Sequence, residues 1–292
     1  MEAKFAITVG KFEALHKGHM YLINETKKYA QANGLASAVM SFTEPHPIQV
    51  LIDPSYKPLL TIREQGLLLE GVVDKWIPYP FDIDFAKMLP EDFCMLLKSR
   101  FNCQALVVGE NFRFGNNRQG TAQSLRDIGM DVIEIPHFEM DGEKVSTSQI
   151  RSYLLEGELK KANNLLGRCF SLVGEVKKGR QLGRTIGFPT ANIHPPITKL
   201  LPPDGVYASN VKFGDMEKKS ITNIGTNPTV SGDGMRKVES HILDFDGDIY
   251  DQEIVVELCR FIRAEHKFSG IRELKRQISE DVRAVNSNVK IR

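Results

Sequence analysis

The hydrophobic pattern of this chain changes character near Gly167, and the change limits the possible folds strongly. Before Gly167, apolar runs of strand length alternate with segments of helical periodicity, as in a parallel, doubly wound α/β sheet. Ligands of such sheets bind at the carboxyl ends of the strands. The pattern predicts strands at 5–9, 36–42, 105–109 and 131–135, and helices at 20–32, 64–73, 93–100 and 121–128.

The second part of the chain differs because its short apolar runs are separated mainly by Gly and Pro. This pattern is typical of an antiparallel barrel or sandwich. Four apolar residues at helical spacing predict a terminal helix at 270–285. We therefore predict two domains, 1–166 and 167–292. The other expected elements are helices at 148–155 and 158–166 and strands at 171–176, 205–213, 218–224, 238–243 and 253–262.

The composition excludes several classes of protein. Of 292 residues, 38 are Lys or Arg and 37 are Asp or Glu, so no global charge attracts nucleic acid or anionic lipid. No apolar run approaches about 18 residues and the N-terminus does not resemble a signal peptide, so we expect no membrane association and a cytoplasmic location. The sequence leaves the oligomeric state open, and a monomer or a weak homo-oligomer is expected. The absence of a CxxC pair argues against zinc and structural disulfides, although four cysteines are present: Cys94, Cys103, Cys169 and Cys259.

Two histidines follow the first predicted strand, in the segment that begins at Gly10 and opens a helix. His16 and His19 are three residues apart, so they share one face at a helix start. The free N–H groups and dipole of a helix N-terminus bind anions, and Gly18 lets a phosphate approach the backbone. Two imidazoles can donate to charge that develops on a phosphoryl oxygen. The alternative interpretation is two surface histidines near a turn.

A Gly-rich segment at 174–192 gives the second chemical signal. Gly179, Gly183 and Gly187 let the backbone wrap a polyphosphate, and Thr190 and Asn192 offer neutral oxygen ligands for Mg²⁺. The segment is not a Walker A loop, because it lacks the Gly-Lys-Ser/Thr ending. The alternative is a Gly-Pro turn that joins two strands.

The first half resembles the HxGH nucleotidyltransferase superfamily and, within it, the bacterial FAD synthetases. The resemblance rests on the segment with both histidines and on three more segments, at 42–47, 109–115 and 145–151. It implies a Rossmann-like domain in which His16 and His19 stabilise the α-phosphoryl group of ATP while the FMN phosphate attacks. Ser146 and Ser148 could also simply cap a helix. The implied ATP-binding residues are Gly10, Phe12, His16, Gly18, His19, Asn111, Arg113, Ser146, Ser148 and Arg151, and the implied flavin-binding residues are Phe42, Pro45, His46 and Pro47.

The second half resembles riboflavin kinases at 174–192, 201–207, 223–229 and 238–245. This implies a small antiparallel β-barrel with a terminal helix, in which Glu239 takes the proton from the ribityl 5′-hydroxyl as that oxygen attacks ATP. A solvent-facing Glu239 and a core role for Phe268 are the competing interpretations. The implied kinase residues are Gly179, Gly183, Thr185, Gly187, Pro189, Thr190 and Asn192 for ATP and Mg²⁺, and Arg263 and Phe268 for the flavin.

Together the two resemblances predict a bacterial bifunctional riboflavin kinase/FMN adenylyltransferase that uses Mg²⁺ and ATP and binds riboflavin, FMN and FAD. Four residues depart from the family pattern: Glu13, Ala14, Gln65 and Asn111. They suggest a competing hypothesis in which the kinase remains but adenylyl transfer is weak, restricted to one flavin redox state, or lost. Two further hypotheses are a regulatory protein that binds FMN or RNA without turnover, and an enzyme that transfers a different nucleotidyl group.

Overall fold

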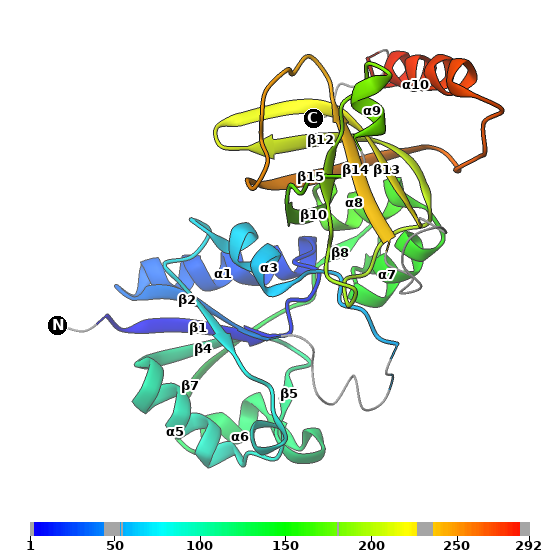
Figure 1. The fold of residues 1–292 in the computed structure, drawn as a ribbon. Coiled ribbons are helices and arrows are strands. Elements are labelled where there is room, and N and C mark those ends of the chain that lie inside the picture. Colours follow the sequence, from blue (N-terminus) through cyan, green and yellow to red (C-terminus); the bar gives the residue numbers. More distant parts are fainter. Residues whose placement is uncertain (1–2, 44–52, 54, 180, 227–235, 287–292) are drawn as a thin grey trace. The chain divides into compact units, whose positions relative to one another are not determined.

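The computed structural model describes residues 3–43, 53, 55–179, 181–226 and 236–286. The chain forms two compact units, Met1–Thr147 and Ser148–Arg292, which are described separately below (Figure 1). Helices α7 (Thr147–Leu155) and α8 (Leu159–Leu166) fall almost entirely in the second unit. The domain boundary after residue 166 stays a prediction. In the described parts of the chain, no helix has the length and apolar character that a membrane span needs.

The first unit is built on a five-stranded sheet in which every strand pairing is parallel. The strand order is β3-β2-β1-β4-β7, so the chain first moves outward on one side of β1 and then on the other. The carboxyl end of β1 is therefore a topological switch point, where such sheets bind ligands. The strands are β1 (Phe5–Gly10), β2 (Ala36–Phe42), β3 (Lys75–Tyr79), β4 (Cys103–Gly109) and β7 (Asp131–Ile135). The predicted doubly wound α/β class is confirmed.

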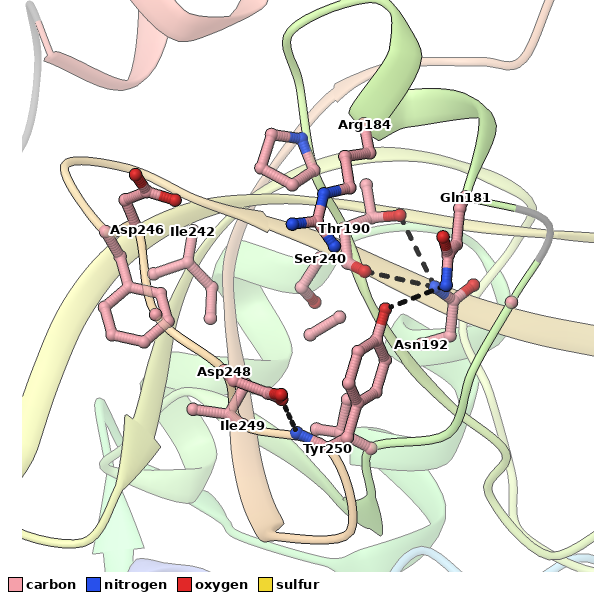
Figure 2. A pocket seen from close by; sticks show the side chains of 16 residues that line it. Gln181, Arg184, Thr190, Asn192, Ser240, Ile242, Asp246, Asp248, Ile249 and Tyr250 are labelled. Carbon is pink, nitrogen blue, oxygen red and sulfur yellow. Dashed lines mark hydrogen bonds between the residues drawn. The ribbon is translucent and has the colours of Figure 1, made fainter.

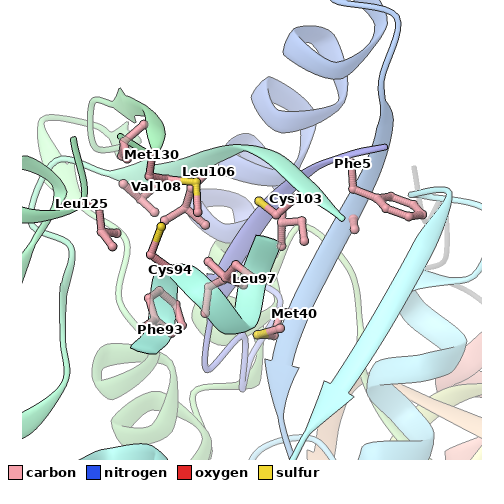
Figure 3. Packing of buried hydrophobic residues seen from close by; sticks show 14 of the residues in the cluster. Phe5, Met40, Phe93, Cys94, Leu97, Cys103, Leu106, Val108, Leu125 and Met130 are labelled. Atoms are coloured by element: carbon pink, nitrogen blue, oxygen red, sulfur yellow. The ribbon is translucent and has the colours of Figure 1, made fainter. Parts of the chain in front are cut away.

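Helices cover both faces of this sheet (Figure 1). Alternate residues of each strand enter different clusters: Met40 packs with α5 and α6 residues, whereas Val39 packs with α1 and α3 residues. Figure 3 shows the first cluster, where Phe93 and Leu97 of α5 meet Leu106 and Val108 of β4. The helices are α1 (Lys17–Ala32), α3 (Ile62–Leu69), α4 (Ile83–Ala86), α5 (Pro90–Phe101) and α6 (Ala122–Asp127), and the minor elements are β5 (Arg113–Phe114), η1 (Asn116–Arg118), β6 (Gly120–Thr121), β8 (Glu139–Met140) and β9 (Glu143–Lys144).

Two elements of the first unit differ from the sequence prediction for local reasons. The sequence did not predict β3, because Pro78 lies within it; as an edge strand that pairs only with β2, it tolerates a residue without an N–H. Helix α3 ends at Leu69, earlier than residue 73, and Gly71 follows with a φ of +70°. The start of α3 is fixed by a capping box between Thr61 and Glu64.

The second unit contains a six-stranded antiparallel sheet of order β10-β15-β12-β13-β14-β11. Its two edge strands, β10 and β11, approach each other. The Lys177 N–H, just after β10, donates to the Asn192 carbonyl of β11, and Gly174 of β10 leaves room for the Ile193 side chain of β11. The predicted antiparallel barrel is therefore confirmed as a sheet that curls until its edges meet. Its strands are β10 (Phe170–Glu175), β11 (Ala191–Ile193), β12 (Gly205–Phe213), β13 (Met216–Thr226), β14 (Arg236–Ile242) and β15 (Glu253–Arg263).

The predicted terminal helix is present as α10 (Ile271–Asn286). Val282 and Val285 of this helix pack on Val206, Ala208 and Ile221 of the sheet. The short α9 (Leu182–Thr185) lies in the connection between β10 and β11.

A chain of buried hydroxyl groups crosses the sheet of the second unit. The Thr222 Oγ1 lies 2.6 Å from the Ser209 Oγ and 2.8 Å from the Ser240 Oγ, and Ser209 also contacts the Ser220 Oγ at 2.8 Å. All four residues are at most 2 % exposed. Buried hydroxyls cost free energy unless they are paired, so the network is stable only when complete.

Val has nearly the shape of Thr but lacks the hydroxyl group, so the Thr222→Val variant leaves the buried Ser209 and Ser240 hydroxyls without one partner each. We therefore expect the free energy of unfolding to fall by about 1–3 kcal/mol. Urea unfolding can be followed by circular dichroism, while fluorescence of the single tryptophan, Trp76, reports the first unit. We expect the circular dichroism transition to shift and the fluorescence transition to stay unchanged. The matched control is Thr226→Val at an exposed position of the same strand. Equal stability of the two variants would contradict the prediction.

Candidate active sites

The loop between β1 and α1 leaves the sheet in a constrained conformation. Phe12 and Leu15 have φ values of +47° and +43°, and both side chains are almost fully buried. A non-Gly residue in the left-handed region costs on the order of 1–3 kcal/mol and persists only where its surroundings hold it. Such strain directly before two histidines favours a functional loop over an ordinary turn.

The two histidines of this loop lie against each other at the start of α1. The rings of His16 and His19 stack with centroids 3.7 Å apart, and Phe12 meets the His19 ring edge-on at 5.2 Å. His16 is the N-cap residue, and its Nδ1 accepts from the His19 N–H at 3.2 Å. A Cβ on Gly18 would lie 3.1 Å from the His16 ring, so the glycine leaves room for the stacked pair. The structure thus brings together the predicted residues Gly10, Phe12, His16, Gly18 and His19 at the switch point.

Two of the departures from the family pattern hold this loop in place. The side chain of Gln65 is fully buried, donates to the Lys11 and Phe12 carbonyls at 3.4 Å each, and accepts from the Ser41 hydroxyl at 3.0 Å. Glu13 is 3 % exposed and accepts from the Tyr56 hydroxyl and, at 3.2 Å, from the Leu59 N–H. These bonds to the backbone and side chains around the loop agree with the expectation that the departures affect the loop at the first site.

The end of β4 carries a third departure, Asn111. Its Nδ2 lies 2.6 Å from the His137 Nε2, which the Lys144 ammonium also approaches to 2.9 Å. The Glu110 carboxylate accepts from the His137 N–H at 3.3 Å. Asn111 follows β4, and the loop with the two histidines follows β1. Because β4 pairs with β1, the two segments leave neighbouring strands of the sheet. His137, Lys144 and Glu110 are site candidates that the sequence analysis missed, because they are contributed by three separate short segments.

The remaining residues predicted for the first site are more scattered. Arg113 is exposed on β5, and the Phe42 ring packs against Phe81 and Phe85 in the core of the sheet. Pro45, His46 and Pro47 lie outside the described residues. Ser146 directly precedes α7, and Ser148 and Arg151 lie on that helix, in the second unit. Roles in binding ATP or flavin stay predictions for all of these residues.

In the second unit, the Gly-rich connection between β10 and β11 is shaped by close backbone contacts. A Cβ on Gly183 would lie 2.3 Å from the Phe188 carbonyl oxygen, and a Cβ on Gly179 would lie 2.9 Å from the Asn192 side-chain amide. Gly187 has a φ of +87°. A larger residue would collide with its neighbours at Gly179 and Gly183 and would be strained by the positive φ at Gly187, which explains the glycine spacing found in the sequence.

A polar cavity of about 500 Å³ lies beside this connection (Figure 2). The Asn192 Nδ2 donates to the Thr190 carbonyl at 3.2 Å and to the Thr190 Oγ1 at 3.4 Å, so the two predicted Mg²⁺ ligands are neighbours. Arg184 adds a cation, and Tyr250 lines the same cavity. The sequence analysis missed the 245–250 part of the wall, although its Asp- and Gly-rich turn directly after the Glu239 segment was a usable signal. The lining includes Gly179, Gln181, Arg184, Pro189, Thr190, Asn192, Ser240, Asp246, Asp248 and Tyr250.

A second cavity, of about 670 Å³, shares Thr190 with the first. Glu239 lines it from β14, where it lies opposite Asn192 of β11 and Asn223 of β13 in the strand register. The wall also contains aromatic and apolar side chains, including Phe188 and Phe268. The structure thus sets the predicted general base beside the predicted phosphate and metal ligands. Gly183 lines the second cavity too, whereas Thr185 and Gly187 line neither of these two cavities.

Arg263 borders the second cavity but has a structural partner. Its guanidinium binds the Asp281 carboxylate of α10 with three contacts of 2.8–3.2 Å, and Asp281 is 3 % exposed. The guanidinium also lies 5.7 Å from the centre of the Phe268 ring. This ion pair fastens the terminal helix to β15 at the wall of the cavity. Asp281 of α10 thus positions Arg263, and Arg263 in turn contacts Phe268. That Arg263 and Phe268 contact the flavin stays a prediction.

Comparison with known proteins divides the chain in the same way. A family model described as FAD synthetase matches residues 1–149, and one described as riboflavin kinase matches residues 166–289. A bifunctional riboflavin kinase/FMN adenylyltransferase of Escherichia coli strain K12 is 36 % identical over 283 residues, which cover 94 % of this chain and 90 % of that protein. The protein of the same description from Bacillus subtilis strain 168 is 33 % identical over 290 residues, covering 96 % and 91 %.

A similar solved structure spans the whole chain. A crystal structure described as a macrolide-efflux protein from Streptococcus pneumoniae superposes with a TM-score of 0.85 at 28 % identity, and covers 99 % of this chain and 96 % of that one. Its description differs from those of the sequence relatives, but the relatives and the two family models agree over nearly the full length. The chain therefore belongs to the bifunctional riboflavin kinase/FMN adenylyltransferase family.

Proposed function

We propose that this chain phosphorylates riboflavin to FMN in its second unit and transfers an adenylyl group from ATP to FMN in its first unit, which gives FAD and pyrophosphate. Membership of the family supports both reactions. The observation that carries the proposal is the pair of cavities that share Thr190, with Gly179 and Asn192 in one and Glu239 in the other. A phosphoryl donor and an acceptor alcohol need such adjoining sites.

In the kinase reaction, the polar cavity takes ATP and the more apolar cavity takes the flavin. Glu239 accepts the proton of the ribityl 5′-hydroxyl, and this oxygen forms a bond to the γ-phosphorus as the bond to ADP breaks. Thr190 and Asn192 contact each other through the Asn192 Nδ2 and the Thr190 Oγ1, and their hydroxyl and side-chain carbonyl oxygens are the neutral ligands that would hold Mg²⁺, which takes its remaining ligands from phosphate and water. The ion would neutralise charge on the phosphates when bound. Arg184 adds a positive charge to the same cavity.

In the adenylyl transfer, His16 and His19 stabilise charge on the α-phosphoryl group of ATP. A neutral His16 ring that accepts at Nδ1 carries its proton on Nε2, so it keeps a donor for a phosphate oxygen. The dipole of α1 favours an anion at the same place. The FMN phosphate attacks, pyrophosphate leaves, and no covalent protein intermediate is needed.

The departures at Glu13 and Gln65 support retention of this second activity. Both side chains are buried and bonded in ways that maintain the strained loop, so they act as positioning residues. Asn111 has a partner in His137. A monomer or weak homo-oligomer stays the expectation for the oligomeric state.

The test is a product assay of the purified full chain with riboflavin, ATP and Mg²⁺, in which flavins are separated by chromatography. It runs once in air and once with dithionite-reduced flavin. Wild-type protein should form FMN and then FAD in air. The His19→Ala variant should accumulate FMN, with FAD formation lowered on the order of 100-fold because a charge-stabilising donor is lost. The Glu239→Gln variant should lose FMN formation by about 100-fold or more.

Each competing hypothesis has its own outcome in this assay. FMN alone under both conditions would show a riboflavin kinase without adenylyl transfer, and FAD only from reduced flavin would show redox restriction. No product with either flavin would leave a binding protein. Parallel loss of both reactions in both variants would contradict the assignment of one site to each unit.

The Gln65→Leu variant should form FAD at least about 10-fold more slowly and unfold with about 1–3 kcal/mol less free energy, because the Lys11 and Phe12 carbonyls lose their donor. The loss should appear in kcat for FAD formation, with FMN formation unchanged. Gln123→Leu on the exposed face of α6 is the matched control. A less stable Gln65 variant with a normal kcat would reduce Gln65 to a purely structural role.

A further inference from the structure

The fold brings two distant cysteines into contact in the second unit. Cys169 and Cys259 are 90 residues apart in the sequence, yet their sulfur atoms lie 2.9 Å apart as free thiols. Cys169 directly precedes β10 and Cys259 lies on β15. These strands are antiparallel, and Phe170 pairs with Leu258. One step further along this register, the two cysteines face each other as cross-strand neighbours.

The Asn163 side chain bonds to the backbone next to each of the two cysteines. The Asn163 Oδ1 accepts from the Phe170 N–H at 2.8 Å, and its Nδ2 donates to the Leu258 carbonyl at 2.9 Å. Asn163 belongs to α8, which packs on both strands. Because the neighbours of both cysteines are held by one amide, the sulfurs stay in contact without movement of the main chain.

The thiol pair lies on the outward face of the strands. Phe170 and Leu258 are at most 2 % exposed, whereas Cys169 and Cys259 are only half-buried, as expected where successive strand residues point to opposite faces. A small oxidant can therefore reach the pair. Cys94 and Cys103 are more deeply buried, at 6 % and 1 % exposed, in the core of the first unit.

The surrounding groups give the two thiols different properties. The hydrogen bond with Cys259 lowers the pKa of the Cys169 thiol, and the nearby Lys212 ammonium acts in the same direction, against burial and the Glu257 and Glu217 carboxylates. The same hydrogen bond, burial and Glu257 raise the pKa of the Cys259 thiol. Cys169 is thus the more readily ionised member of the pair.

We propose that Cys169 and Cys259 form a reversible thiol–disulfide site that reacts with hydrogen peroxide. The Cys169 thiolate attacks one peroxide oxygen, the O–O bond breaks, and the departing hydroxide takes a proton and leaves as water. Cys259 then attacks the sulfenic sulfur of Cys169, the S–S bond forms, and the hydroxyl group leaves as a second water. Two thiols lose two electrons in total, and one peroxide is reduced to two waters.

The disulfide would join the strands that lead into the two cavities. From Cys169, β10 continues toward Gly179, and from Cys259, β15 continues toward Arg263. Closing a 90-residue loop in the unfolded chain should raise the unfolding temperature of the oxidised protein by several degrees. This site is independent of the proposed reactions, because neither cysteine lines either of these two cavities.

The experiment treats the full chain with hydrogen peroxide and maps peptides by mass spectrometry without reduction. The expected product is one cross-linked pair that contains Cys169 and Cys259, with free thiols falling from four to two and returning after dithiothreitol. In the Cys259→Ser variant, dimedone should trap a sulfenic acid at Cys169. In the Cys169→Ser variant, dimedone labelling of Cys259 should be at least about 10-fold lower. Cys94→Ser is the control and should keep the cross-link.

Three outcomes would overturn the proposal. They are peroxide consumption without the Cys169–Cys259 cross-link, disulfides only between separate chains, and equal dimedone labelling of the two single variants. The readout is chemical, so it does not depend on flavin turnover. FMN and FAD formation by the reduced protein reports the proposed function separately.

Discussion

Both candidate sites depend on backbone conformations that their loops could not keep alone. After β1, two buried residues, Phe12 and Leu15, adopt left-handed conformations, and the buried amide of Gln65 binds the carbonyls of Lys11 and Phe12. In the second unit, the connection after β10 folds so tightly that a side chain at Gly183 would collide with the Phe188 carbonyl oxygen. Packing within each unit holds these strained loops, and the loops in turn set the positions of His16, Thr190 and the residues around them.

The two units solve the same chemical problem with different architecture. The parallel sheet offers one switch point, and the two histidines proposed to bind phosphate lie there, at a helix start after the central strand. The antiparallel sheet has no such point, and instead its strand register sets Asn192, Glu239 and Asn223 side by side. The ion pair between Arg263 and Asp281 then fastens α10 at the wall of the second cavity.

Periodicity and local motifs predicted the parts of this structure that depend on short segments. The alternation before Gly167 predicted four of the five strands of the first sheet, and the glycine spacing at 179–187 indicated a tightly folded connection. Contacts between distant segments were not predictable. Pro78 concealed an edge strand, and the partners that Gln65 and Glu13 bind in the interior lie in distant segments. The partner of Arg263 lies 18 residues away, and that of Cys169 lies 90 away. Sequence spacing could not reveal either pair.

The central claim is that the kinase reaction depends on Glu239 and the adenylyl transfer on His19, so that the two reactions can be separated. The most direct measurement mixes the purified His19→Ala and Glu239→Gln proteins in one tube with riboflavin, ATP and Mg²⁺, and follows FAD over time. Each variant alone should form FAD from riboflavin about 100-fold more slowly than the wild-type protein. The mixture should form FAD faster than either variant alone, because FMN released by the first variant is a substrate for the intact first unit of the second. If both variants are folded and the mixture forms FMN but no more FAD than either variant alone, the account is contradicted, because both residues would then be needed within one chain.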